Sequence, residues 1–128
     1  MSLRKNKILI IEDEVAMAEM YKKKLEDSDF KVFVAYTSKE GIKEAEKRKP
    51  DLIVLDILLP TETGIAFLRK AKKNLKIRKI PVIVFSNYDD LDTRRDAMEL
   101  GAQVYFLKTD FISSLIEEPE KSRIRFFG

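Results

Sequence analysis

The chain has 128 residues, of which 45% are hydrophobic and 37% are charged, so it fits one domain with a packed core rather than a disordered chain. It contains no cysteine and no histidine, which excludes disulfides, thiolate or histidine metal sites and serine–histidine catalysis. Any metal must therefore be held by oxygen ligands, which favours magnesium, calcium or manganese. Because no apolar run approaches the roughly 18 residues of a membrane span, we expect a cytoplasmic protein without membrane attachment.

The net charge is +3 and the isoelectric point is about 9.0, which raises the question of nucleic-acid binding. The basic residues cluster in two stretches, 21–26 and 69–79. No recognition helix, zinc finger or aromatic stacking pattern accompanies them, so we do not expect direct contact with nucleic acid. We interpret both stretches as solvated surface, with weak attraction to acidic partners as the alternative.

Apolar segments and helix-forming segments alternate along the chain. The segments that we predict to be strands are 7–11, 31–36, 52–55, 81–85 and 104–107. Four of them are near-continuous apolar runs rich in valine and isoleucine, which is typical of strands covered on both faces in a parallel sheet. Apolar spacing and capping residues predict helices over 14–27, 38–49, 65–75, 89–101 and from Asp110 to about Pro119. Lys72 interrupts the apolar stripe of the third helix, and Gly64 before it is expected to adopt an unusual backbone angle.

This alternation of strands and helices predicts an α/β fold, a doubly wound parallel sheet of five strands with helices on both faces. We expect one domain over residues 1–118. Residues 119–128 then form a C-terminal tail or a truncated linker.

Polar side chains follow four of the predicted strands at the point where each strand ends. Glu12 and Asp13 follow the first strand, Asp56 the third, Ser86 the fourth and Lys108 the fifth. Ligands of such sheets bind outside the carboxyl ends of the strands. Each residue alone has an ordinary explanation as a helix cap, a turn residue or a surface lysine, but their coincidence at one edge favours a single site.

Clustered carboxylates repel one another, and a divalent cation relieves that repulsion. Magnesium is usually held by one or two carboxylates, waters and a phosphate oxygen. With the cation in place, an oxygen of Asp56 is suited to attack phosphorus and form an aspartyl-phosphate. Lys108 and Ser86 are suitable partners for the charge on the transferred phosphoryl group.

The motifs around these residues resemble the receiver domain of two-component response regulators, and the resemblance covers residues 5 to about 117. The motifs are "IIEDE" (10–14), "DILLPTETG" (56–64), "VFSN" (84–87) and "YFLK" (105–108). The resemblance implies the flavodoxin-like strand order 2-1-3-4-5. It also implies a signalling phosphoacceptor rather than an enzyme, one that assists its own phosphorylation and dephosphorylation and receives phosphate from a sensor histidine kinase or a histidine phosphotransfer protein.

The resemblance also implies a role for each acid of the site. Asp56 matches the phosphoacceptor and Asp13 the main metal-binding acid. Glu12 occupies the second acidic position, and the backbone carbonyl of Leu58 completes the protein's metal contacts. The implied cofactor is Mg²⁺, with Mn²⁺ as a possible substitute.

A switch and an output surface follow from the same resemblance. Ser86 matches the hydroxyl residue that moves toward the phosphoryl group, and Lys108 the lysine that pairs with that group. Tyr105 matches the aromatic residue that turns inward when the hydroxyl residue moves. The expected output surface, for an output domain or an effector protein, lies at about 89–118.

Three residues depart from the family's usual pattern. Thr109 stands where a proline usually follows the lysine, Asn87 is larger than the usual alanine or glycine, and Leu58 places an apolar side chain beside the site. Thr109 predicts a trans peptide bond and a changed loop after Lys108. Leu58, with Asn87 and Tyr88, predicts altered water access to the site and a changed rate of autodephosphorylation. These departures also motivate an alternative hypothesis, a protein-interaction module of the same fold that no longer responds to phosphorylation.

Two unrelated functions fit less well. The segment "TETG" (61–64) resembles the phosphate loop of a flavodoxin, but that loop should follow the first strand and not the third. A phosphatase of the haloacid dehalogenase type also uses an aspartate nucleophile, but it requires a second acid two residues later, where this chain has Leu58.

Overall fold

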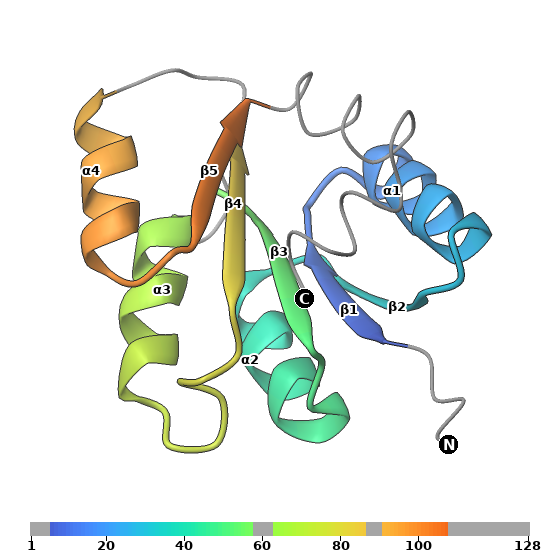
Figure 1. Cartoon of the computed structure of the whole chain (residues 1–128), viewed down its shortest axis with the longest axis horizontal. Coiled ribbons are helices and arrows are strands. Elements are labelled where there is room, and N and C mark those ends of the chain that lie inside the picture. The colour runs from blue at the N-terminus through green and yellow to red at the C-terminus, as the bar shows by residue number, and fades with distance from the viewer. Residues whose placement is uncertain (1–5, 58–62, 87–90, 108–128) are drawn as a thin grey trace.

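The computed structural model describes residues 6–57, 63–86 and 91–107, and strands and helices alternate along these ranges (Figure 1). The strands are β1 (Lys7–Ile11), β2 (Lys31–Ala35), β3 (Leu52–Asp56), β4 (Val82–Ser86) and β5 (Val104–Leu107). The helices are α1 (Val15–Asp27), α2 (Ser38–Arg48), α3 (Gly64–Lys73) and α4 (Leu91–Glu99). The predicted helix from Asp110 and the tail 119–128 lie outside the described residues.

The strands form one sheet in the order β2-β1-β3-β4-β5, and every neighbouring pair is parallel. The predicted doubly wound sheet and its strand order are therefore confirmed. Figure 1 shows helices on both faces of the sheet, with α1 on the face opposite α2, α3 and α4. No helix among the described residues combines the length and the apolar character that crossing a membrane requires.

Alternate residues of the central strands fill two separate cores. Leu9, Ile53 and Val84 pack with side chains of α2, α3 and α4, whereas Ile10 and Val54 pack with side chains of α1. Full burial of such a side chain stabilises the fold by about 1.5–3 kcal/mol. Both faces of the central strands are thus covered, which explains their continuous apolar sequence.

Gly64 is the first residue of α3, and its role differs from the prediction. Among the described glycines only Gly101 has a positive φ, of 97°, so the unusual backbone angle expected at Gly64 is wrong. A Cβ atom at Gly64 would lie 2.9 Å from the carbonyl oxygen of Asp56 and 2.8 Å from the Cα atom of Ile57. The absence of a side chain therefore lets α3 begin directly against the end of β3.

The third helix is shorter than predicted. It ends at Lys73 because Asn74 adopts extended backbone angles and its side-chain oxygen accepts a hydrogen bond from the backbone N–H of Lys76 at 2.9 Å. Leu75 is consequently 79% exposed, so its assignment to the apolar stripe of this helix is wrong.

Candidate functional site

The first two acids of the site lie directly after β1. The backbone N–H of Glu12 donates to the carbonyl oxygen of Ala35 at 3.0 Å, which extends the pairing of β1 with β2 by one residue. Glu12 is fully buried, whereas Asp13, the next residue, is half-buried. The chain therefore holds one carboxylate inside the protein and presents the next one toward the edge of the sheet.

Asp56 is the last residue of β3 and is 3% exposed. It pairs with Phe85 of β4, and the next backbone N–H, of Ile57, donates to the carbonyl oxygen of Phe85 at 3.2 Å. The backbone N–H of Gly64 then donates to the carbonyl oxygen of Ile57 at 2.8 Å. These contacts fix the position of the Asp56 backbone at the centre of the sheet edge.

The three acids converge as the sequence predicts. One carboxylate oxygen from each of Glu12, Asp13 and Asp56 lies within 4.8 Å of the other two. Two ionised carboxylates at this separation repel by roughly 3 kcal/mol at the effective dielectric constant of a protein surface, although solvent at half-buried Asp13 screens part of this. The cluster supplies only oxygen ligands, which fits a hard divalent cation such as Mg²⁺.

Ser86 and Tyr105 lie on the neighbouring strands. Ser86 is the last residue of β4 and is fully buried, one residue beyond the partner of Asp56 in the sheet. Tyr105 pairs with Val84 and is 6% exposed, and the guanidinium of Arg94 lies 5.8 Å from the centre of its ring. The sheet therefore brings Ser86 to the same edge as the acids and places Tyr105 on the next strand.

The remaining predicted site residues lie outside the described part of the chain. They are the backbone carbonyl of Leu58, the side chain of Lys108, and the atypical residues Asn87 and Thr109. Their roles stay predictions.

Tyr21 of α1 belongs to the surroundings of the site, a relation that the sequence did not indicate. Its ring packs edge-on against Phe85, with ring centres 5.3 Å apart and planes at 87°. Burial is the largest cause that raises the pKa of the phenol far above its ordinary value of 10.0, and the charges of Glu12, Asp56 and Glu14 raise it further. The spacing of the helix placed Tyr21 in the core, but no sequence signal links its hydroxyl to acids on other elements.

We expect Tyr21→Phe to make the fold more resistant to alkali. Above pH 10.0 the unfolded chain releases the Tyr21 proton while the folded chain keeps it, so alkali favours unfolding of the wild type. Relative to the variant, the wild type should lose about 1.4 kcal/mol of unfolding free energy per pH unit. Urea unfolding of both proteins in a metal chelator, at neutral pH and in steps above pH 10, measures the gap between their free energies of unfolding. A gap that stays constant across this range would contradict the expected coupling.

Comparison with known proteins agrees with this geometry. The family model described as "Response regulator receiver domain" matches residues 8–118. The KDP operon transcriptional regulatory protein KdpE of Escherichia coli is 38% identical over 108 residues, which are 84% of this chain and 47% of that protein. The chain spans about half of the length of the curated relatives that it matches.

Solved structures show the same fold. The BeF3-activated N-terminal receiver domain of Klebsiella pneumoniae RstA is 25% identical with a TM-score of 0.82, and the match covers 96% of this chain and all of that one. The Mn²⁺-bound form of response regulator Rcp1 is 21% identical with a TM-score of 0.79, covering 95% of each chain. With its acidic cluster at the carboxyl edge of a 2-1-3-4-5 sheet, the chain belongs to the response regulator receiver domain family of two-component signalling.

Proposed function

We propose that Asp56 is the phosphoacceptor of this receiver domain and that its phosphorylation controls an output surface. The observation behind the proposal is the position of Asp56 at the end of the buried strand β3, with oxygens of Glu12 and Asp13 within 4.8 Å of its own. A nearly buried carboxylate among like charges is costly for the fold. That cost is understandable if the cluster serves to bind a cation and to react with phosphorus.

Glu12, Asp13 and Asp56 would hold the cation, Mg²⁺ or in its place Mn²⁺, together with the backbone carbonyl of Leu58. When bound, the cation supplies positive charge that offsets the carboxylates and the phosphoryl oxygens. Asp13 is half-buried, so a cation held by this cluster would stay accessible to solvent, which suits a magnesium ion that retains part of its hydration.

The reaction is a transfer between two nucleophiles. An oxygen of Asp56 attacks the phosphorus of a phosphohistidine, the O–P bond forms as the P–N bond breaks, and the imidazole leaves with the electron pair and takes up a proton. The donor would be a sensor histidine kinase or a histidine phosphotransfer protein. The Ser86 hydroxyl and the Lys108 ammonium would contact the phosphoryl oxygens. The same groups would assist the later hydrolysis, so the domain would assist both its own phosphorylation and its own dephosphorylation.

The phosphorylated state would be read through the surface at about 89–118. Ser86 ends β4 beside the strand that carries Tyr105, so a movement of the Ser86 hydroxyl toward phosphate has a direct route to the buried ring. On α4, the large apolar side chains of Leu91 and Met98 are 76% and 44% exposed. Exposed apolar side chains are suited to contact an output domain or effector protein. A cytoplasmic location is part of this proposal.

Phosphorylation by a small donor tests the proposal. We expect acetyl phosphate with Mg²⁺ to add a single group of about 80 Da to the intact mass of the protein. A chelator or the Asp56→Ala change should abolish the addition, because the first removes the cation and the second the nucleophile. An addition that survives Asp56→Ala, or no addition to a protein that binds Mg²⁺, would exclude the proposed role.

The alternative hypothesis of a module that ignores phosphorylation rests on Leu58, Asn87 and Thr109. All three lie outside the described residues, and the contacts of the described residues give it no support. An amide spectrum that is unchanged by beryllofluoride in the presence of Mg²⁺ would favour it.

A further inference from the structure

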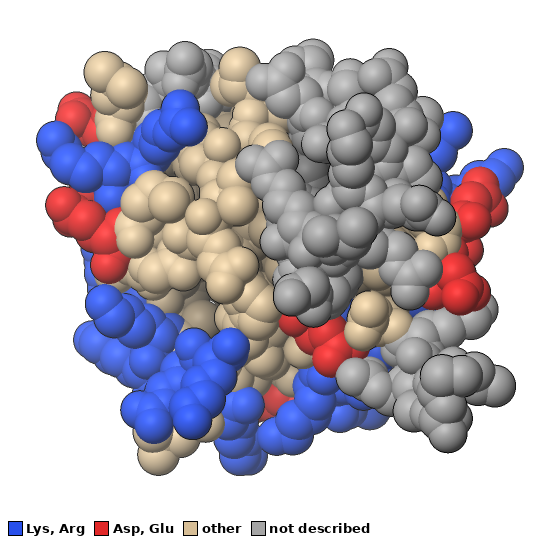
Figure 2. Space-filling model, viewed as in Figure 1, with Lys and Arg blue, Asp and Glu red and all other residues tan. Residues whose placement is uncertain are grey.

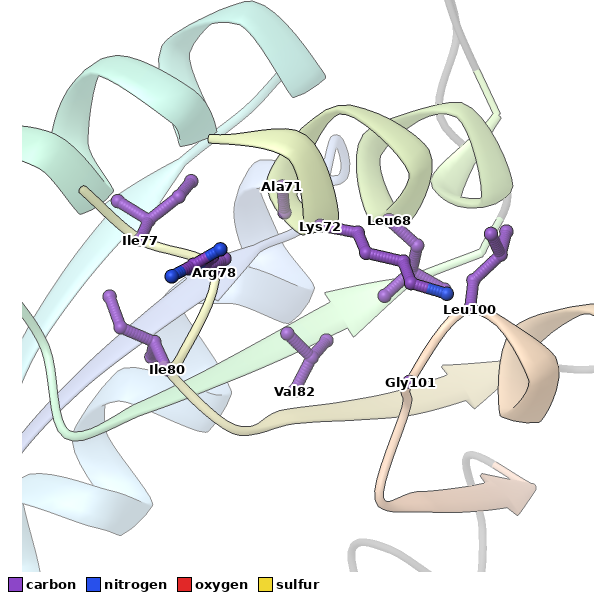
Figure 3. A pocket seen from close by; sticks show the side chains of 9 residues that line it. All are labelled: Leu68, Ala71, Lys72, Ile77, Arg78, Ile80, Val82, Leu100 and Gly101. Atoms are coloured by element: carbon purple, nitrogen blue, oxygen red, sulfur yellow. The ribbon is translucent and has the colours of Figure 1, made fainter. Parts of the chain in front are cut away.

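A groove lies at the amino-terminal edge of the sheet, at the opposite end from Asp56. It is a cavity of about 200 Å³ between the second half of α3, the segment 74–81, the start of β4 and the turn between α4 and β5 (Figure 3). Its walls are aliphatic and come from Leu68, Ala71, Ile77, Ile80, Val82 and Leu100. The space is large enough to receive a bulky aliphatic side chain.

Two cations border this groove. Lys72 and Arg78 belong to its lining, and both residues are exposed. Figure 3 shows the Lys72 side chain extending along the groove toward Leu100, so that its aliphatic stem adds to the wall while its ammonium faces solvent. Neither side chain forms an ion pair or a hydrogen bond with another residue in the described part of the chain. The position of Lys72 beside the groove explains why it interrupts the apolar stripe of α3.

The part of the surrounding surface formed by α3 and the segment 74–81 is basic. Residues 63–88 include seven lysines and arginines and no acid. These basic residues are exposed. Figure 2 shows basic side chains gathered at the lower left, where Figure 1 places the end of α3 and the segment before β4. A second depression of about 300 Å³, lined by Ala66, Arg69, Lys70 and Lys73, continues the basic surface along α3. Such a field attracts acidic partners and raises their rate of association.

The segment that forms one side of the groove is braced by hydrogen bonds. The Asn74 side chain donates to Glu46 of α2 at 3.0 Å. The backbone carbonyl of Asn74 accepts from the N–H of Arg78 at 2.8 Å, and Ile80 donates to the carbonyl of Ile77 at 3.0 Å. A braced groove needs little ordering when a partner binds, which favours affinity.

We propose that this groove binds an acidic amphipathic segment of a partner protein, with an apolar side chain in the cavity and carboxylates paired with Lys72 and Arg78. Nucleic acid fits less well because no aromatic side chain lines the groove for base stacking. A membrane surface fits less well because the apolar area is concave, although Leu75 protrudes beside it. The site lies away from the acids that form the proposed phosphorylation site, so it can be tested in the unphosphorylated protein.

The probe is a labelled helical peptide with leucines on one face and glutamates on the other, whose binding is followed by fluorescence anisotropy. We expect Lys72→Glu combined with Arg78→Glu to weaken binding by at least about tenfold. The matched control combines Lys23→Glu with Lys24→Glu, which makes the same charge change at exposed positions of α1 on the other face of the sheet. The control should change the affinity by less than about twofold.

Two further measurements distinguish binding in this groove from non-specific electrostatic attraction to the basic surface. A peptide with serine in place of each leucine should bind at least about tenfold more weakly, because it cannot fill the groove. If charge reversal disturbs folding by circular dichroism, Lys72→Gln with Arg78→Gln should still weaken binding. Equal binding of the serine peptide, an equal loss in the α1 control, no measurable binding of the leucine peptide, or tighter binding of duplex DNA or of phosphatidylserine vesicles would overturn the proposal.

Discussion

Replacing Asp13 with asparagine is expected to weaken Mg²⁺ binding by at least about tenfold, equal to about 1.4 kcal/mol. Asp13 is the half-buried member of a cluster whose oxygens lie within 4.8 Å of one another, and the change keeps its shape while it removes one negative charge. At a Mg²⁺ concentration about 100 times the wild-type dissociation constant, the ion should stabilise the wild type by about 2.7 kcal/mol and the variant by about half of that or less. Phosphorylation by acetyl phosphate should slow in parallel.

Thermal unfolding with and without Mg²⁺ measures this difference. Asp27→Asn is the matched control. It makes the same chemical change away from the cluster, because Asp27 is the exposed last residue of α1. The control should keep the full stabilisation by Mg²⁺. Equal stabilisation of Asp13→Asn and of the wild type would show that Asp13 does not hold the ion.

Asp56→Asn is expected to stabilise the metal-free protein while it abolishes phosphorylation. The carboxylate of Asp56 is 3% exposed and lies among two other acids, so removing its charge relieves repulsion that no bound cation offsets. We expect a gain of about 1–2 kcal/mol in the free energy of unfolding, or several degrees in melting temperature. Unfolding in a chelator measures the gain.

The sign of this effect distinguishes a reactive acid from a structural one. If a buried carboxylate mainly supports the fold through its contacts, its replacement should lower the free energy of unfolding. Adding Mg²⁺ should reverse the order of the two proteins, because the wild type binds the ion more tightly. A melting temperature of Asp56→Asn below that of the wild type in a chelator would contradict the account.

The sheet and its order could be predicted because burial on both faces leaves a strong sequence signal. Strands covered on both sides must be continuously apolar, and the helices between them show their own spacing. Parallel strands then carry the residues after them to one edge, so the convergence of Glu12, Asp13 and Asp56 could be expected before any coordinates. Asp56 and Ser86 differ from the prediction only in being the last residues of their strands rather than the first residues after them, because sheet pairing continues to Phe85 and Leu107.

The missed features depend on contacts between distant parts of the chain or on local competition for hydrogen bonds. The α3 helix ends earlier than its apolar spacing predicts, because the side-chain oxygen of Asn74 accepts a hydrogen bond from the backbone N–H of Lys76 beyond the helix end. A glycine is required at position 64 because the end of β3 approaches its Cα atom closely, and the spacing of residues in the sequence does not show this contact. The relation of Tyr21 to the acids arises only when α1 packs on the sheet. The groove beside Lys72 forms only when the turn at Leu100 and Gly101 packs against the distant stretch 68–82.

Locating the phosphoryl group on the chain tests the central claim most directly. The protein is treated with acetyl phosphate and Mg²⁺, the acyl phosphate is reduced with borohydride, and the modified residue is identified by peptide sequencing in a mass spectrometer. We predict modification at Asp56, with Asp13 and with Asp51, which lies at the opposite end of β3, unmodified. Modification at another acid with Asp56 intact, or no modification of a protein that binds Mg²⁺, would contradict the account.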